Sequence, residues 1–355
     1  MEQNRQENNK IYRYCGAIHI HSLHSDGTGN IDEISKSAKA CGLDWIIVTD
    51  HNNFDVQEGV FNGITVIKGE EISLEDKNHY LTFGINKCIS PSENIAENIE
   101  EVKQNGGFGF AAHPDERDCR PNTKPPIKWL DKTIIPDGVE IWNWFSQWGD
   151  NYNSKNIFTT AYSYFFRHNL VKKPYESTLK WWDKLNNDKP EIVPALGGVD
   201  AHALIIRNYI FPVTVFPYET TFKTITNQII LKNPPDEDFN VRKGQILNAI
   251  KNGNNLIFNR KINKNAPEIY VKNNKETAFC GDNILVDDNT YLHFNCDRCS
   301  DIKIFKNGQL IAEKNAKTFE IKLNEGGKYR VEAEINGYGY AYSNPVIVKE
   351  ENFLG

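Results

Sequence analysis

The decisive stretch of this sequence is Tyr14-Cys-Gly-Ala-Ile-His19-Ile-His21-Ser-Leu-His24-Ser-Asp26-Gly27. Its first half is apolar and short, as in a buried strand, and it runs directly into two histidines that are one residue apart. Side chains at positions i and i+2 of a strand point to the same face, so His19 and His21 can bind one metal ion together. The stretch therefore predicts a strand that ends at a metal site.

Other ionisable residues follow short apolar runs in the same way. Four of them come directly after such runs, namely His51, Glu71, His113 and Asp200. Up to about residue 260, short apolar runs alternate with amphipathic stretches, a pattern typical of parallel strands joined by helical crossovers. In such folds the active site lies at the carboxyl ends of the strands. The positions of these four residues agree with that polarity.

The pattern also predicts individual elements. Apolar residues recur at helical spacing over residues 31–41, where Asn30 and Glu33 can form a capping box. Further helices are expected at 94–104 and around 241–252. The strands expected before residue 260 are 17–20, 45–49, 65–68, 80–85, 108–112, 138–142 and 193–197.

After Pro267 the pattern changes to short alternating runs, at 268–272, 291–296, 302–306, 309–312, 318–323, 328–335 and 338–343. Asn307-Gly308 and Asn336-Gly337 separate consecutive runs, which is a strong hairpin signal. We expect a small antiparallel β-sandwich over 266–350. It follows a domain over 13–262 with an aromatic-rich insertion at about 145–190, and a polar, disordered arm over 1–12.

Bulk properties limit the partners that we expect. The chain has 355 residues and a net charge of −6. Its Lys and Arg residues form no basic stripe, so we expect no stable binding of nucleic acid. No run approaches the ~18 apolar residues of a membrane span, and the polar N-terminus lacks an apolar signal core. The seven cysteines are irregularly spaced, which suits reduced thiols. We therefore expect a cytoplasmic protein, with a homo-oligomer left open.

Nine residues are candidate metal ligands. They are His19, His21, Asp26, His51, Glu71, His79, His113, Asp200 and His202. Nitrogen and carboxylate ligands without thiolates suit Zn, Mn or Fe.

As an ordered set, these motifs resemble the PHP (polymerase and histidinol phosphatase) superfamily of metallohydrolases. The matching segments are His19-x-His21 with Ser25-Asp26-Gly27, Thr49-Asp50-His51, Gly69-Glu-Glu71-Ile-Ser73, His79, Ala112-His113-Pro114 and Asp200-Ala-His202. Two further segments, Gly138-Val-Glu-Ile-Trp-Asn143 and Gly337-Tyr-Gly-Tyr-Ala-Tyr-Ser-Asn-Pro345, resemble the CehA/McbA-like subgroup.

The resemblance implies an α/β fold, a distorted (β/α)7 barrel of PHP type that holds two or three divalent metal ions. It assigns His19, His21, Glu71 and Asp200 to a first metal. Glu71 would bridge to a second metal, completed by His79 and His113. Asp26, His51 and His202 would hold a third. Asp26 stands where some members have histidine, which leaves occupancy of the third site open, and Glu70 is an alternative to Glu71.

The implied chemistry is hydrolysis. Three divalent ions bring more positive charge than three carboxylates and a bridging hydroxide remove, which favours an anionic substrate such as a small phosphate ester. The metal-bridging hydroxide would attack in line, with Glu71 holding the metals and Asp200 or His202 handling the proton. Two alternatives remain open. One is a carboxylester or amide hydrolase that uses the same metals, and the other is a non-catalytic binder of a ligand such as a sugar or peptide.

Candidate substrate contacts are His24, Arg117, Asn143 and His168. A guanidinium such as that of Arg117 suits phosphate. The aromatic residues Trp142, Trp144, Phe145 and Trp148 come directly after the apolar run 139–141 and either line a substrate pocket or pack against the insertion.

Overall fold

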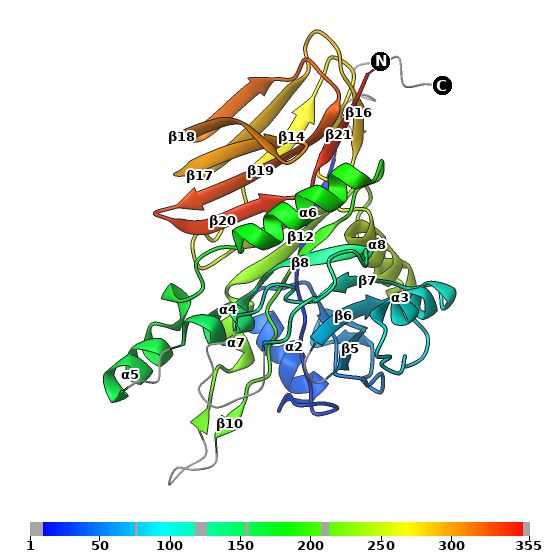
Figure 1. Ribbon diagram of the computed structural model, residues 1–355, viewed down its shortest axis with the longest axis vertical. Coiled ribbons are helices and arrows are strands. Elements are labelled where there is room, and N and C mark those ends of the chain that lie inside the picture. Colours follow the sequence, from blue (N-terminus) through cyan, green and yellow to red (C-terminus); the bar gives the residue numbers. More distant parts are fainter. Residues whose placement is uncertain (1–9, 75–76, 118–125, 153–155, 207–212, 351–355) are drawn as a thin grey trace. The chain divides into compact units, whose positions relative to one another are not determined.

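The computed structural model describes residues 10–74, 77–117, 126–152, 156–206 and 213–350. It divides into two compact units. The site unit, so called because it contains all nine candidate ligands, comprises residues 15–181 and 196–226. The C-terminal unit comprises the remainder, which is the start of the chain, residues 182–195, and the chain from 227 onward. Each unit contains both helices and β-strands, so the fold is of the mixed α/β class (Figure 1).

The site unit contains two groups of strands. In the first, β1 (Tyr12–Ile18), β2 (Trp45–Val48) and β4 (Ile64–Lys68) are parallel, and β3 (Gly59–Phe61) pairs antiparallel with β4. The second group has the order β5 (Glu70–Leu74), β6 (Lys77–Phe83), β7 (Phe108–Ala111), β8 (Gly138–Asn143) and β9 (Ala195–Gly198). All seven strands expected before residue 260 are present, with shifted ends. Closure of these strands into a sevenfold barrel stays a prediction.

The expectation of parallel strands throughout is wrong for part of the second group. β5 pairs antiparallel with β6, and β6 pairs antiparallel with β7, whereas β7 and β8 are parallel. Only two residues separate β5 from β6, and a parallel pair needs a crossover of about a dozen residues or more. The short connection therefore forces β5 and β6 to pair antiparallel.

The site unit contains the helices expected at 31–41 and 94–104, together with further helices after β8 and β9. They are α2 (Ile31–Ala40), α3 (Ile95–Gln104), α4 (Trp144–Asn151), α5 (Ile157–Phe165), the first half of α6 (Glu176–Asp188), α7 (Tyr218–Phe222) and a 3-10 turn at Arg167–Asn169. The capping box of α2 is formed as expected, because Glu33 N–H donates to Asn30 Oδ1 (3.0 Å) and Asn30 N–H donates to Glu33 Oε2 (2.9 Å). Ile34 and Ala38 form its buried face. The segment at 145–190 is largely helical, and a short hairpin, β10 (Ile205–Ile206) with β11 (Val213–Thr214), follows β9.

The C-terminal unit is built mainly from antiparallel strands (Figure 1). Its elements are β12 (Ile225–Leu231), α8 (Phe239–Lys251), β13 (Asn255–Asn259), β14 (Glu268–Lys272), β15 (Thr277–Ala278), β16 (Asn283–Leu285), β17 (Tyr291–Lys306), β18 (Gln309–Lys322), β19 (Gly327–Ile335), β20 (Tyr338–Ser343) and β21 (Val346–Lys349). α8 and β13, which precede residue 262, belong to this unit. The expected domain boundaries and the sandwich arrangement stay predictions.

Both predicted hairpins are confirmed. β17 pairs with β18 across Asn307-Gly308, and β19 pairs with β20 across Asn336-Gly337. All four turn residues have positive φ, between 48° and 78°, as the tight hairpin turns of Asn-Gly pairs require. The runs 291–296 and 302–306, which were expected to form two strands, lie in one continuous strand, β17. Its pairing with β18 shifts register between Asn295 and Ser300.

The last turns of α6, at Trp182–Asp188, pack on β19 within the C-terminal unit. The buried Arg330 guanidinium donates to both carboxylate oxygens of Asp183, from Nε at 2.7 Å and from Nη2 at 2.6 Å. Lys328 Nζ donates to the backbone carbonyls of Asn186, Lys189 and Glu191. No helix in the described ranges is long and apolar enough to cross a membrane.

Replacing the N-cap of α2 tests how much that cap stabilises the site unit. Asn30→Ala removes the acceptor of the Glu33 N–H, so we expect the free energy of unfolding to fall by about 1 kcal/mol. Asn240→Ala, at an exposed position inside α8, is the matched control and should leave stability within about 0.5 kcal/mol. Urea unfolding followed by circular dichroism measures both, and equal midpoints for the two variants would contradict the prediction.

Candidate metal centre

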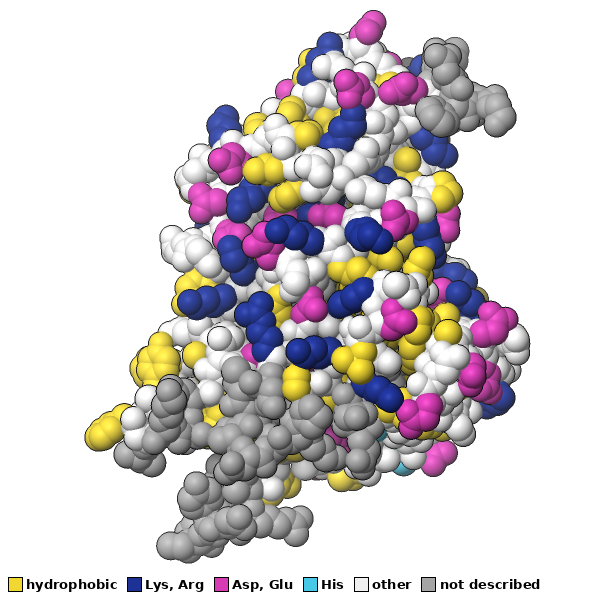
Figure 2. All heavy atoms as spheres, viewed as in Figure 1, with side chains coloured by type: hydrophobic (Ala, Val, Ile, Leu, Met, Phe, Trp, Pro, Cys, Tyr) yellow, Lys and Arg dark blue, Asp and Glu magenta, His cyan; other side chains and the backbone are white. Residues whose placement is uncertain are grey.

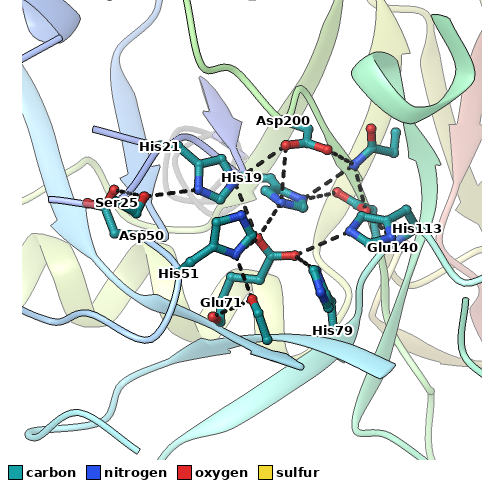
Figure 3. A network of polar contacts seen from close by, with 12 residues as sticks. His19, His21, Ser25, Asp50, His51, Glu71, His79, His113, Glu140 and Asp200 are labelled. Carbon is teal, nitrogen blue, oxygen red and sulfur yellow. Dashed lines mark hydrogen bonds and ion pairs between the residues drawn. The ribbon is translucent and has the colours of Figure 1, made fainter. Parts of the chain in front are cut away.

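The nine candidate ligands converge near the carboxyl ends of the central strands. His19 and His21 follow β1, His51 follows β2, Glu71 lies just past β4 at the start of β5, and His113 follows β7. Asp200 and His202 follow β9, Asp26 precedes α2, and His79 lies within β6. Figure 3 shows most of these side chains pointing toward one another from different elements.

The Glu71 carboxylate lies at the centre of the cluster and is buried. Its Oε2 is 3.2 Å from His19 Nε2, 3.3 Å from His21 Nε2 and 3.1 Å from His51 Nδ1. Its Oε1 is 2.8 Å from His79 Nδ1 and 3.3 Å from His113 Nε2. One carboxylate thus faces five imidazoles (Figure 3).

Strand alternation decides between the two neighbouring glutamates. Glu70 is also buried, but it points to the other face of β5, where its Oε2 accepts a hydrogen bond from Ile89 N–H at 2.9 Å and its Oε1 one from the Cys88 thiol at 3.0 Å. Consecutive strand residues face opposite sides. Glu71 alone of the pair therefore reaches the histidines.

Two aspartates complete the cluster on different sides. Asp200 Oδ1 lies 3.4 Å from His21 Nε2 and 3.6 Å from His19 Nε2. Asp26 Oδ1 lies 3.3 Å from His202 Nε2, and its Oδ2 lies 3.7 Å from His51 Nε2. The Asp26 side chain is 55% exposed and that of His51 is 27% exposed, whereas Asp200 is only 9% exposed. The cluster therefore opens to solvent beside Asp26 and His51.

Ligand atoms of all nine residues fall into four overlapping groups with mutual separations within 4.8 Å. The groups are His21, Asp26, His51 and His202; His19, His113 and Asp200; His19, His21 and Glu71; and His51, Glu71 and His79. These sets differ in part from those that the resemblance implies, because His21 also lies near the Asp26 group and His113 lies near His19. The structure brings the candidates together, and their roles as ligands stay a prediction.

Hydrogen bonds around the cluster fix which ring nitrogen faces inward in three of its histidines. His19 Nδ1–H donates to Glu140 Oε1 (2.8 Å), His79 Nε2–H to the Leu74 carbonyl (2.7 Å), and His113 Nδ1–H to the Ile127 carbonyl (3.2 Å). Carbonyls and carboxylates only accept, so these outer nitrogens carry protons, and the other nitrogen of each ring is the one directed at Glu71. Outer partners of this kind orient metal-binding histidines.

Glu140 is a functional residue that the sequence reasoning missed. It is buried on β8, its Oε2 accepts from His113 N–H at 2.6 Å, and Asn143 Nδ2 donates to the same oxygen at 3.0 Å. The available signal was a charged residue at a buried position of a predicted strand, because acidic side chains are rarely buried without a partner.

A second outer partner supports His21. The buried Asp50 carboxylate accepts from Ser22 N–H (2.7 Å), from Ser22 Oγ (2.6 Å) and from Ser25 Oγ (2.5 Å). Because Ser25 donates to Asp50, its oxygen can accept from His21 Nδ1–H, 3.5 Å away. His21 Nε2 is then left as the nitrogen that faces the carboxylates.

The pKa values of two histidines in the cluster suit the binding of cations. His21 Nε2 is buried, makes no hydrogen bond with a described residue, and points at Glu71 and Asp200. Burial, followed by the neighbouring charges of His202 and His51, lowers the pKa of His21 to about 4, so its imidazole is neutral as a metal ligand must be. Burial also lowers the pKa of His19, but Asp200, Glu71 and Glu140 outweigh it and raise that pKa well above its usual value. This excess of negative charge is what bound cations would balance.

Three of the candidate ligands occupy left-handed backbone conformations. His19 has φ of 68°, His113 of 28° and Asp200 of 51°. Non-glycine residues there cost of order 1–3 kcal/mol each and persist where the surroundings hold them, typically at functional sites. The bend at each of these residues directs a side chain from a strand end into the cluster.

The predicted substrate contacts are placed differently. Asn143 lies in the centre, with Nδ2 3.3 Å from Asp200 Oδ2. His24 is exposed on the loop between His21 and Asp26. The Arg117 guanidinium stacks 4.0 Å above the Tyr175 ring, and the His168 ring lies 5.9 Å from that of Trp144. Substrate roles for these four residues stay predictions.

Comparison with known proteins bears on the same segment of the chain. Residues 17–135 match the PHP domain family. Seven of the nine candidates lie within the matched residues, and Asp200 and His202 lie outside them.

Individual proteins show more distant similarity. An uncharacterized protein of Methanocaldococcus jannaschii is 28% identical over 147 residues, which cover 36% of this chain and 80% of that protein. A two-domain crystal structure from Bacteroides vulgatus, containing a predicted PHP-like metal-dependent phosphoesterase, has 15% identity, a TM-score of 0.45, and coverage of 94% of this chain and 95% of that one. An amidohydrolase from Chromobacterium violaceum has 12% identity, a TM-score of 0.32, and coverage of 57% and 92%.

Gly198 offers a test of the outer shell. A Cβ at this position would lie 1.6 Å from Glu140 Oε1 and 3.1 Å from His19 Cβ, so Gly198→Ala must displace Glu140 from His19. Losing such an outer partner costs about 10–100-fold in metal affinity, and we expect a loss of that size for Zn or Mn by isothermal titration calorimetry. Gly149→Ala in α4 is the matched control, because its Cβ would meet nothing within 4 Å. Equal affinities for both variants would refute the positioning role of Glu140.

Proposed function

We propose that this protein is a metal-dependent hydrolase that cleaves phosphoesters of small molecules. The observation that carries the proposal is the buried Glu71 carboxylate facing five imidazoles, with Asp200 beside it and an opening at Asp26 and His51. The match of residues 17–135 to the PHP domain supports the metal-dependent class.

We assign the metal-holding roles from the placement of the side chains. His19, His21, Glu71 and Asp200 form one set around the buried oxygens, and His79 and His113 approach the other oxygen of Glu71. Asp26, His51 and His202 form the set nearest to solvent. When bound, divalent ions lower the pKa of a water and polarise a phosphoryl oxygen. Zn, Mn and Fe are the metals that this donor set suits.

The chain's own residues supply orientation and proton handling. Glu140 holds His19, and Ser25 holds His21, so the inner nitrogens keep one direction without rearrangement. Asp200 accepts a hydrogen bond from Asn143 through Oδ2 at 3.3 Å, and its Oδ1 lies 3.4 Å from His202 Nδ1. We propose that Asp200 or His202 accepts the proton released in hydrolysis, His202 being the nearer of the two to the open side.

The preference for a phosphoester rests on charge. Nitrogen ligands outnumber carboxylates in the nine-residue set, so two or three divalent ions would leave the opening positive. An anionic phosphoryl group suits such an opening better than a neutral ester does. A carboxylester or amide hydrolase on the same residues is the alternative that the following experiment separates from this proposal.

Parallel hydrolysis of 4-nitrophenyl phosphate and 4-nitrophenyl acetate by protein loaded with Mn, Zn or Fe tests the reaction class. We expect metal-dependent turnover of the phosphate, and its loss by at least about 100-fold in His51→Ala. His293→Ala is the matched control, since that histidine lies on β17 of the C-terminal unit and pairs with Glu320 at 2.8 Å. Metal-dependent turnover of the acetate alone would replace the proposal by the carboxylester alternative.

The proton role has a separate test. Asp200→Asn keeps the shape and one oxygen ligand but weakens proton acceptance, so we expect kcat to fall by about 10²–10⁴-fold. The fall in kcat reports proton acceptance only if the metal content of the variant, measured by inductively coupled plasma mass spectrometry, stays at the wild-type level. A variant with full metal content and wild-type kcat would exclude Asp200 and leave His202, which His202→Gln tests in the same way.

A further inference from the structure

Four aromatic rings within α5 and at its C-cap are exposed. Phe158 is 82% exposed, Phe165 72%, Phe166 54% and Tyr162 49%. Figure 2 shows hydrophobic side chains on the surface at the place that α5 has in Figure 1. Contiguous exposed apolar surface on a protein usually marks a binding site, so these rings call for an explanation beyond the packing of the helix.

A continuous series of ring contacts connects this surface with the metal centre. The Phe145 ring lies 5.2 Å from the His202 ring and 5.9 Å from Trp148, and Trp148 lies 4.6 Å from Phe216. Phe216 lies 5.8 Å from Tyr164, which lies 5.3 Å from Phe165. We call this series the aromatic track; its residues are Phe145, Trp148, Phe216, Tyr164 and Phe165.

The track begins on the open side of the cluster. His202 Nε2 is 3.3 Å from Asp26 Oδ1, and the Asp26 side chain is 55% exposed, the most of any candidate ligand. Phe145 is half-buried and flanks that histidine. A substrate that presents a phosphoryl group at Asp26 and His51 would therefore have Phe145 beside its other end.

The rings of the track are held in place by polar contacts at their edges. Trp148 Nε1–H donates to the Ser163 carbonyl at 2.9 Å, so its polar edge is satisfied. The Arg167 guanidinium lies 5.5 Å from the centres of both the Tyr164 and Phe216 rings and donates from Nη1 to the Tyr164 carbonyl at 3.0 Å. Phe216 is only 3% exposed and packs against its neighbours, so the accessible ring surface comes from the half-buried Phe145, Trp148 and Tyr164 and the exposed Phe165. Fixed aromatic rings offer apolar surface at little cost in conformational entropy.

We propose that the aromatic track binds an extended apolar group of the substrate, so that the preferred substrates are phosphomonoesters of apolar alcohols. This inference rests on the proposed function of the metal centre and names the substrate class. Full burial of a methylene is worth about a fourfold gain in affinity. An alkyl chain laid along the rings should therefore increase kcat/KM with each added carbon until the track is covered.

A homologous series of alkyl phosphates tests the proposal. Ethyl, butyl, hexyl and octyl phosphate have nearly the same leaving-group chemistry, so a slope in kcat/KM against chain length reports binding. For the wild-type protein we expect a rise of about two- to fourfold per methylene, carried mainly by KM. Phe145→Ala and Trp148→Ala should flatten the slope of kcat/KM against chain length.

Phe61→Ala is the matched control, because Phe61 is a half-buried aromatic residue on β3 and is not part of the track. Metal content is measured for every variant, since Phe145 contacts His202, and Trp148→Phe should restore the slope if an aromatic surface is what matters. A flat wild-type series, or a slope that persists in both alanine variants, would overturn the inference while leaving the phosphoesterase proposal intact.

A binding experiment separates the failure of this inference from failure of the proposed function. Calorimetric titration of metal-loaded protein with ethyl-, butyl- and hexylphosphonate needs no turnover. Affinity that rises with chain length and depends on Trp148, without hydrolysis of any ester, would support the track and refute the phosphoesterase. Affinity that does not rise with chain length would refute the track, whether or not the esters are hydrolysed.

Discussion

The chemistry of the site unit depends on one buried carboxylate. An ionised glutamate that is removed from water is costly unless charge or hydrogen bonds surround it, and Glu71 has five imidazoles within 3.3 Å. Those imidazoles come from four separate strands or their ends, so the folded arrangement of β1, β2, β6 and β7 is what places them around Glu71. A concentration of nitrogen and oxygen donors in so small a volume is more easily explained by bound cations than by stability.

The outer hydrogen bonds show how the fold maintains this arrangement. Glu140 binds both the ring of His19 and the backbone of His113, and Asp50 holds the loop that contains Ser22 and Ser25. With these partners fixed, the inner nitrogens have little freedom. The left-handed conformations of His19, His113 and Asp200 are a cost of that arrangement.

Local patterns in the sequence predicted the parts of the structure that depend on neighbouring residues. The cap of α2, the Asn-Gly hairpins and the apolar strands all arise from residues a few positions apart, and the nine candidate ligands were found because each occurs in a short motif. The antiparallel pairing of β5 with β6 follows from the two-residue connection between them. Glu140 and the aromatic track depend on contacts between distant positions, such as His19 with Glu140, 121 residues apart. Such contacts leave no periodic signal in a single sequence.

Asn143 has two functions within one side chain. Its amide nitrogen donates to Glu140 and lies 3.3 Å from Asp200, and its amide oxygen caps α4 by accepting from Ser146 N–H at 2.8 Å. α4 is the helix that presents Phe145 and Trp148. One amide group therefore contacts both the carboxylates of the centre and the first turn of the helix that carries these two rings. If binding of a cation in the centre moves Asn143, it also moves the start of α4. A ligand bound on that helix would then change the affinity of the centre for the cation by the same factor.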